Sequence, residues 1–331
     1  MTERSITGGI TGGPIPHWPG EFVSLGDYQV FVRRVPAVDG AEPALFVHGL
    51  AGSSRNWTDL MDLLRSRLDC AAIDLPGFGD SPPRPDGRYS IGALAQTTAT
   101  LIEREGRGPV HLIGNSLGGA VCVKLAARRP DLVRTLTLVS PALPDPRPRM
   151  DLIRFPVMSL PRVGGWALAK FKTFTAEQRV WNVMTTCYFD AAVVPPARLA
   201  HEVAELARRD TLSYADDALI GSIRSLTLET LRTGPTSPWH DATRCTMPTL
   251  VLYGSHDRLV SPRVAGKAAQ LFPDSRVVVL PRTGHVAQME HPGAVAAEMA
   301  VLLAGIPVNS GRLAVRSGTE NGEHSVAAPA G

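Results

Sequence analysis

Short apolar runs recur along the first half of the chain, and each is followed by a loop and a segment with helical periodicity. The continuous apolar runs at residues 44–47 and 70–73 are typical of strands that are buried on both faces. Helical patterns follow them at residues 56–67 and 91–103. Strands that alternate with helices predict a mostly parallel, doubly wound sheet with helices on both faces, which is an α/β fold.

This alternation begins after a hairpin pattern and extends to the end of the core. Residues 22–35 alternate apolar and polar side chains around Gly26-Asp27, which indicates a hairpin. A further strand is expected in the apolar run that begins at residue 110 and leads into the Gly-x-Ser-x-Gly segment at 114–118, and an alanine-rich helical pattern follows that segment directly. Strands are also expected at residues 134–139, 249–253 and 276–280, and helices at 262–271 and 292–303.

A long segment interrupts the alternation. Proline-punctuated helical patterns without strands occupy it, and proline-rich stretches at residues 144–148 and 233–238 flank it, as expected of domain boundaries. The two ends of the chain are rich in glycine and small polar residues, which favours disorder. We therefore expect a flexible leader at residues 1–20, an α/β core at 21–143 and 242–306, an inserted helical cap at 144–241 and a disordered tail at 307–331.

The composition excludes several classes of protein. The net charge is only +3 over 331 residues, and the basic residues are scattered, so no nucleic-acid-binding surface is expected. The four cysteines lie far apart in apolar segments, which favours free buried thiols over disulfides or a metal site. No apolar run reaches the roughly 20 residues that span a bilayer. Without a signal-peptide pattern, we expect a cytoplasmic protein whose membrane contact is at most peripheral.

The strongest chemical signal is Gly-Asn-Ser-Leu-Gly at residues 114–118, between a predicted strand and a predicted helix. Strand, sharp turn and helix are the context that a nucleophile elbow requires. Gly114 and Gly118 have no side chains, which allows the strand and the helix to approach each other closely. Ser116 is therefore the candidate nucleophile.

Two further residues stand where a serine nucleophile needs partners. Asp257 follows one buried strand, and His285 follows the next. A serine hydroxyl is almost un-ionised at neutral pH, so it needs a neutral imidazole to accept its proton. That imidazole in turn needs a carboxylate to fix its tautomer. Loops at neighbouring strand ends can bring Ser116, Asp257 and His285 together as a catalytic triad, which requires no metal and no cofactor.

An oxyanion hole completes the predicted site. The backbone N–H of Leu117, directly after the nucleophile, is one expected donor. The other is expected from the loop after the first buried strand, at the N–H of Leu50. Removing one such donor typically lowers the rate by about 100- to 1,000-fold, so this loop belongs to the predicted mechanism.

Five segments in this order carry a resemblance. They are Phe-Val-His-Gly at residues 46–49, Asp-Leu-Pro-Gly-Phe-Gly-Asp-Ser at 74–81, the elbow at 114–118, Tyr-Gly-Ser-His-Asp at 253–257, and Gly-His at 284–285. Together they make the chain resemble the α/β-hydrolase superfamily of serine hydrolases with a helical cap, similar to esterases and lipases. The chain order Ser, Asp, His is that of this superfamily. The resemblance implies that His48, Asp74 and Ser81 shape loops and are not catalytic.

Other titratable residues are weaker candidates. His256 adjoins the predicted acid but projects differently, His291 stands at a predicted helix start, and His111 lies within the elbow strand, where packing is the expected role. Asp145 is a fallback acid, because some members of the superfamily place the acid after the preceding strand.

A serine at the elbow restricts the reaction. Epoxide hydrolases and haloalkane dehalogenases of this fold use Asp there, because a serine would form an ether that water does not cleave. Serine implies acyl transfer, so we expect a hydrolase of esters or related acyl bonds in a hydrophobic small molecule. Three alternatives remain. The Gly-Asn-Ser-Leu-Gly-Gly elbow resembles that of carbon–carbon hydrolases that act on ring-cleavage products, so such an enzyme is the first. The others are a cofactor-free haloperoxidase-like enzyme and a non-catalytic ligand receptor. A monomer and a homodimer fit the sequence equally.

Overall fold

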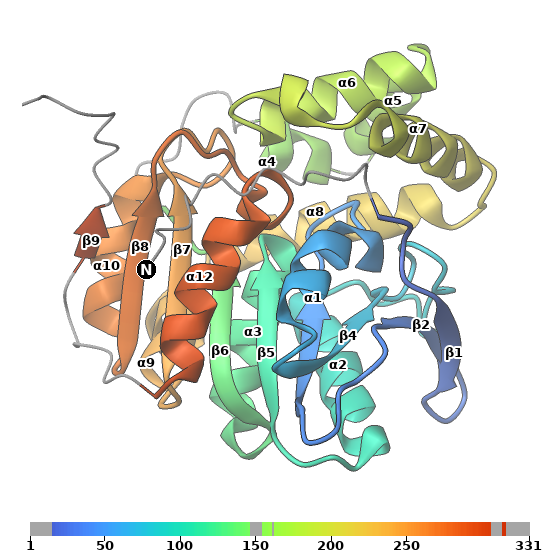
Figure 1. Cartoon of the computed structure of the whole chain (residues 1–331). Helices are drawn as coiled ribbons and strands as arrows, with labels where there is room; N and C mark the ends of the chain where they lie inside the picture. The colour runs from blue at the N-terminus through green and yellow to red at the C-terminus, as the bar shows by residue number, and fades with distance from the viewer. Residues whose placement is uncertain (1–14, 146–153, 161, 306–312, 316–331) are drawn as a thin grey trace, which may run out of the picture.

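A computed structural model describes residues 15–145, 154–160, 162–305 and 313–315. Within these residues a single sheet of nine strands runs through the molecule in the order β1-β2-β4-β3-β5-β6-β7-β8-β9 (Figure 1). β2 is antiparallel to both of its neighbours, and every other pair is parallel. The strands are β1 (Gly20–Ser24), β2 (Gln29–Arg34), β3 (Glu42–Val47), β4 (Leu68–Ile73), β5 (Val110–Asn115), β6 (Val133–Val139), β7 (Thr249–Gly254), β8 (Ser275–Leu280) and β9 (Leu313–Val315).

Helices cover both faces of this sheet, as the apolar strand pattern requires. Buried side chains of α2, α3, α9 and α10 pack on one face, and those of α1 and α12 pack on the other. The sequence prediction of a doubly wound, mostly parallel α/β sheet is therefore confirmed. The core helices are α1 (Thr58–Leu64), α2 (Ile91–Glu105), α3 (Leu117–Arg128), α9 (Pro238–Thr243), α10 (Ala265–Leu271), α11 (Ala287–Glu290) and α12 (Pro292–Leu303).

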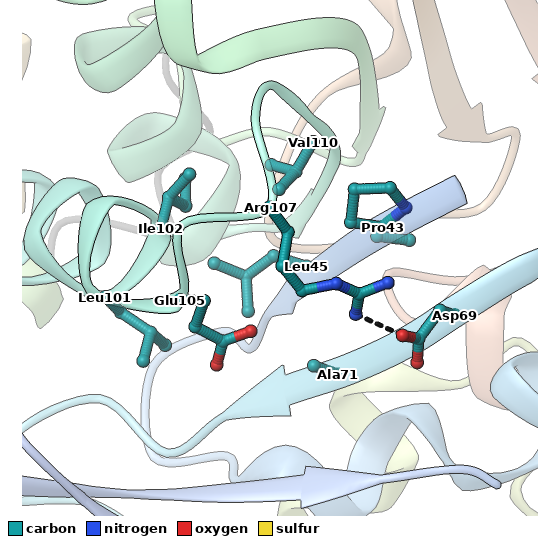
Figure 2. Close-up of a pocket in the computed structure, with 10 residues that line it drawn as sticks. Pro43, Leu45, Asp69, Ala71, Leu101, Ile102, Glu105, Arg107 and Val110 are labelled. Atoms are coloured by element: carbon teal, nitrogen blue, oxygen red, sulfur yellow. Dashed lines mark ion pairs between the residues drawn. The ribbon is translucent and has the colours of Figure 1, made fainter. Parts of the chain in front are cut away.

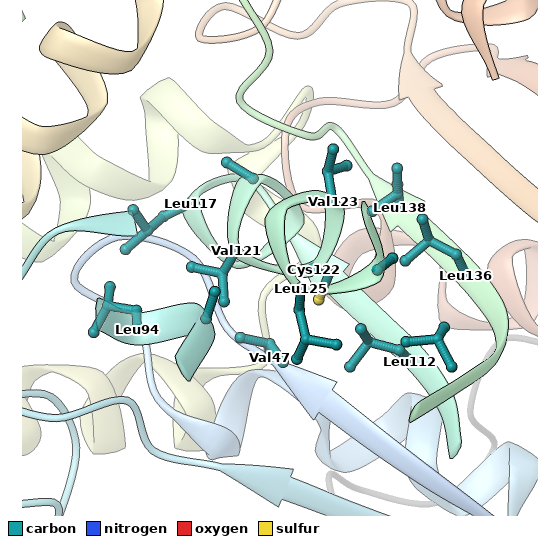
Figure 3. Close-up of a cluster of buried hydrophobic side chains, with 14 of the residues drawn as sticks. Val47, Leu94, Leu112, Leu117, Val121, Cys122, Val123, Leu125, Leu136 and Leu138 are labelled. Atoms are coloured by element: carbon teal, nitrogen blue, oxygen red, sulfur yellow. The ribbon is translucent and has the colours of Figure 1, made fainter. Parts of the chain in front are cut away.

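The helix α3 that follows the elbow lies at the centre of the larger core cluster. Leu117, Val121 and Leu125 point from it toward apolar side chains of α2 and of the strands (Figure 3). Eleven of its twelve residues are buried, and even Lys124 is only 3% exposed in this environment. The position of Ser116, directly before α3, is therefore fixed by packing.

Among the described residues between β6 and α9, five α-helices form an insertion at the place where the cap is expected. They lie beyond the carboxyl ends of the parallel strands (Figure 1), and they are α4 (Arg154–Ser159), α5 (Val163–Phe171), α6 (Ala176–Cys187), α7 (Pro196–Asp210) and α8 (Ala215–Thr230). α8 is anchored on the core. Its Ser225 hydroxyl accepts a hydrogen bond from the N–H of Ile91 at 2.8 Å, and its Glu229 lies 3.4 Å from the ammonium of Lys124.

The structure differs in three places from the boundaries expected for the leader, core, cap and tail. Pro238–Thr243 packs on α3, so the core resumes slightly before residue 242. In the leader, the indole of Trp18 donates to the Thr58 carbonyl at 3.1 Å, so part of the leader is docked. In the tail, Leu313–Val315 pairs with β8 as a parallel strand, because the edge of β8 offers unpaired backbone groups. Residues 1–14, 306–312 and 316–331 lie outside the described ranges.

None of the helices in the described part of the chain is long and apolar enough to span a bilayer.

Candidate active site

The predicted elbow has the strained backbone that the motif requires. Ser116 stands between β5 and α3 with φ 53° and ψ −115°, in the positive-φ region that L residues rarely adopt. A Cβ on Gly114 would lie 2.6 Å from the carbonyl oxygen of Gly118, and a Cβ on Gly118 would lie 2.2 Å from that of Val47. Glycine is therefore the residue that fits at both positions, and the turn presents Ser116 at the carboxyl edge of the sheet.

The structure brings the predicted base and acid into direct contact. His285 Nδ1 lies 2.8 Å from Asp257 Oδ2, and both side chains are buried. The other carboxylate oxygen of Asp257 accepts the backbone N–H groups of Leu259 and Val260 at 2.8 and 2.9 Å. Burial alone would raise the pKa of Asp257, but the charge and hydrogen bond of His285, together with these two N–H donors, hold the pKa below its usual range.

Asn115 joins the base loop to the elbow, a contact that the sequence does not reveal. Its side-chain amide donates to the His285 carbonyl at 3.1 Å and to the Val139 carbonyl at 3.0 Å. The residue directly before Ser116 thus holds the backbone of His285. Ser116, Asp257 and His285 come from the ends of β5, β7 and β8 and gather at one edge of the sheet.

The loop after β3 forms a tight turn beside the nucleophile. The N–H of Gly52 donates to the Gly49 carbonyl at 3.1 Å, and Ala51 has a positive φ of 59°. A Cβ on Gly49 would lie 3.2 Å from the Cβ of Ser116, so the turn passes directly over the elbow. Leu50 occupies the second position of this turn, whose N–H the turn itself does not use. Leu117 opens α3, where helix N–H groups lack intrahelical partners.

A family model described as the alpha/beta hydrolase fold matches residues 43–292. The chain belongs to this family. Among curated relatives, a pimeloyl-[acyl-carrier protein] methyl ester esterase of Neisseria meningitidis is 27% identical over 268 residues, which cover 80% of this chain and 78% of the relative. An acetyltransferase component of the acetoin cleaving system of Cupriavidus necator is 37% identical over 110 residues, but the match spans only 33% of this chain and 29% of that relative.

A solved structure supports the same fold. A putative lipase of Acinetobacter baumannii superposes with a TM-score of 0.72 at 21% identity, covering 88% of this chain and 92% of the lipase.

Three polar residues that the hydrolase resemblance assigns to loop shaping are fully buried and bonded to backbone. His48 Nε2 accepts the N–H of Leu75 at 2.9 Å, so Nδ1 carries the proton and donates to the Gly49 carbonyl at 2.7 Å. Burial lowers the pKa of His48, which keeps its ring neutral. Asp74 accepts N–H groups of Ser54 and Asp80, and the Ser81 hydroxyl donates to the Asp74 carbonyl.

The weaker candidates make contacts away from the Asp257–His285 pair. His111 bonds to Thr135 and Glu42, and His291 lies 3.2 Å from the Arg282 carbonyl. His256 bonds to Ser255, and its ring contacts that of Phe189 in a tilted arrangement with centroids 4.5 Å apart. Asp257, rather than the fallback Asp145, is the carboxylate hydrogen-bonded to His285.

The cap helix α7 contacts the turn of Leu50. Arg209 Nη1 donates to the Ala51 carbonyl at 2.8 Å, and the neighbouring Arg208 donates to the Gly79 carbonyl at 2.6 Å. Both arginines lie in the segment expected to form the cap, but the sequence gave no signal for these partners, which lie about 130 and 160 residues away in the chain.

Two hollows differ in their relation to this site. An open hollow of about 380 Å³ lies beside the loop that carries Asp257, and Phe189 and residues of this loop line it. A cavity of about 20 Å³ lies at the opposite, amino ends of β3 and β4, where Arg107 pairs with Asp69 (Figure 2). The second cavity has room for about one water molecule, too little for a substrate.

Within the described ranges no three His, Cys, Asp or Glu side chains are arranged to bind a metal ion.

Proposed function

We propose that this protein is a serine hydrolase that cleaves a carboxylic ester of a hydrophobic small molecule through an acyl-enzyme on Ser116. The observation that carries the proposal is the buried His285–Asp257 hydrogen bond of 2.8 Å, joined to the elbow through Asn115. An imidazole with its Nδ1 proton held by a carboxylate leaves Nε2 free to act as a general base toward a serine hydroxyl.

In the proposed reaction, the Ser116 hydroxyl attacks the ester carbonyl while His285 Nε2 accepts its proton. The tetrahedral oxyanion is stabilised by the N–H groups of Leu50 and Leu117. Collapse of this intermediate breaks the bond to the alkoxide, which takes the proton from His285. Water then attacks the acyl-enzyme with His285 again as base, and the acid is released from Ser116.

The choice of ester rests on the nucleophile and on the relatives. A serine adduct is productive only when a second displacement at an acyl carbon can release it. The Neisseria relative with 80% coverage of this chain is named a methyl ester esterase. An apolar substrate fits the cap, where a small cluster of Val180, Met184 and Tyr188 packs against residues of α7 and of the base loop.

A panel of p-nitrophenyl esters of increasing acyl length tests this proposal. The wild-type protein is expected to release p-nitrophenol, and Ser116→Ala is expected to lose at least about 1,000-fold in kcat. A fluorophosphonate probe should label the wild type and fail to label Ser116→Ala. His240→Gln, an exposed change remote from the triad, is the matched control.

Different outcomes point to the alternatives. Turnover of a ring-cleavage dienone without turnover of any ester would overturn the ester assignment in favour of carbon–carbon hydrolysis. Tight binding of a small ligand by a protein that the fluorophosphonate does not label would favour a receptor.

A further inference from the structure

The end of the cap helix α6 lies between the loops that carry Asp257 and His285. The guanidinium of Arg258, next to the acid, donates to the Thr185 carbonyl at 2.6 Å. The backbone N–H of His285 itself donates to the Cys187 carbonyl at 2.6 Å. Carbonyls in the last turn of a helix lack intrahelical partners, and here the acid loop and the base loop satisfy two of them.

Phe189, two residues after Cys187, contacts the same two loops through its ring. The ring lies 4.5 Å from that of His256, beside the acid, and the guanidinium of Arg282, in the base loop, lies 5.7 Å from its centroid. Residues 185–190, which we term the α6 end, therefore contact the acid loop and the base loop through both backbone and side chain.

A buried carboxylate completes this arrangement. Glu290, at the end of the short helix α11, is 8% exposed. One of its oxygens accepts the N–H of Gly284 at 2.7 Å, and the other accepts the N–H groups of Phe189 and Asp190 at 2.9 and 3.1 Å. Hydrogen bonds to a carboxylate are about twice as strong as neutral ones. A single side chain thus joins the α6 end to the residue that directly precedes His285.

The backbone of Gly284 packs directly against the backbone of the α6 end, with no space for a side chain between them. A Cβ on Gly284 would lie 2.3 Å from the Cys187 carbonyl oxygen and 2.6 Å from the Phe189 nitrogen. Closely packed groups transmit displacement instead of absorbing it. A movement of the α6 end is therefore a movement of Gly284 and of His285.

We propose that Glu290 is a positioning residue that couples the α6 end of the cap to His285, so that the cap sets the orientation of the general base. The inference rests on the proposed function, because it assigns His285 as the base. Glu290 acts through the N–H groups of Gly284, Phe189 and Asp190, and its removal is expected to lower kcat while leaving KM nearly unchanged.

Glu290→Gln tests this coupling with almost no change in volume. Three N–H donors converge on the carboxylate, and an amide would turn its NH₂ group toward at least one of them. We expect kcat to fall by about 10- to 100-fold in the ester assay, with KM within about 3-fold of wild type, as for a change felt only at the transition state.

The matched control is Glu298→Gln, which changes a second buried glutamate of the same C-terminal region. Glu298 bonds to Arg276, far along α12 from the base loop. Both variants are expected to lower the melting temperature, but only Glu290→Gln is expected to lower kcat. Equal kcat in the two variants would show that Glu290 is merely structural.

Arg258→Ala provides a second variant that is expected to fold, because Arg258 is exposed. It removes the bond between the acid loop and Thr185 and is expected to lower kcat by about 3-fold or more, also without a matching rise in KM. An unchanged kcat would contradict the role of the α6 end.

A readout independent of activity separates this inference from the proposed function. Amide hydrogen exchange at Gly284, Phe189 and Asp190 should be faster in Glu290→Gln than in wild type and in Glu298→Gln. If the wild type hydrolyses no ester, the proposed function fails while the exchange measurement still tests the coupling. If the wild type is active and the exchange rates are equal, the coupling fails alone.

Discussion

At the scale of single residues, the site depends on glycine positions where the Cβ atom of any other residue would clash with backbone. The backbone of α3 approaches β3 so closely at Gly118 that a Cβ would lie 2.2 Å from the Val47 carbonyl oxygen and 2.5 Å from that of His48. Backbone atoms cannot rotate away as a side chain can. The strained Ser116 is held in place because Gly114 and Gly118, two residues to either side of it, lack side chains and allow this close approach.

Gly118→Ala is expected to destabilise the protein by about 3 kcal/mol, the upper part of the range for an added methyl group in a packed interior. Gly165→Ala, on an exposed face of α5 with nothing within 4 Å of the added Cβ, should instead stabilise it by up to about 1 kcal/mol through helix propensity. Chemical denaturation of both variants measures the difference. A small loss for Gly118→Ala would mean that strand and helix can separate at this point.

At the scale of elements, the inserted helices contact the loop of His285 and the turn of Leu50 through α6 and α7. The end of α6 bonds to the base loop through Cys187 and Glu290, and α7 bonds to the turn of Leu50 through Arg209. The turn contains Ala51 at a positive φ, a conformation that persists only where surrounding contacts hold it. The cap thus supports the geometry of the site as well as covering it.

Arg209→Ala is expected to lower kcat by about 10-fold with little change in KM, because the Leu50 N–H is the proposed oxyanion donor and such a donor acts mainly in the transition state. Arg209→Lys should restore part of this loss. Arg208→Ala is the control, since its partners, the Gly79 carbonyl and the carboxylates of Glu205 and Asp80, lie outside the turn. The prediction is wrong if the two alanine variants lose kcat equally, as measured with a p-nitrophenyl ester.

At the scale of the whole molecule, the described part of the leader is bound between core and cap. His17 lies 2.8 Å from the Thr58 hydroxyl and accepts a hydrogen bond from Arg198 of α7 at 3.0 Å. Burial, followed by the charges of Arg198 and Arg55, lowers the pKa of His17 to about 3. The neutral ring is therefore the form that the folded protein requires.

This lowered pKa predicts an acid-dependent loss of stability. Between the ordinary histidine pKa of 6.5 and about 3, the unfolded chain binds a proton at His17 that the folded protein does not. The free energy of unfolding consequently falls as the pH falls through this window. The melting temperature of His17→Gln should decrease less between pH 7 and pH 4 than that of the wild type. The control His240→Gln changes an exposed histidine, and its decrease should equal that of the wild type. Identical slopes for all three proteins would contradict this assignment.

The sequence predicted the fold class and much of the element order, because buried strands and amphipathic helices leave periodic patterns that need no knowledge of the tertiary structure. It also predicted that Asp257 and His285 meet, since residues that follow neighbouring parallel strands gather at one edge of the sheet. The short helix α11 and the strand β9 were missed, because four and three residues are too few to show a period.

What the sequence determined by itself is the chemistry: a serine in a strand–turn–helix motif, with an acid and a base after later strands. What only the tertiary structure decided is how that chemistry is supported. In the sequence nothing distinguishes Glu290 and Arg209 from other polar residues, and the Phe189 and Ala51 backbone groups that they bond lie about 100 and 160 residues away. A hydrogen bond between a side chain and a distant backbone group leaves no pattern in the local sequence. Any glutamate or arginine fits the polar positions of a helix equally well, whether or not it makes such a bond. The packing of the inserted helices on the core decides which of them bond to the loop of His285 and to the turn of Leu50.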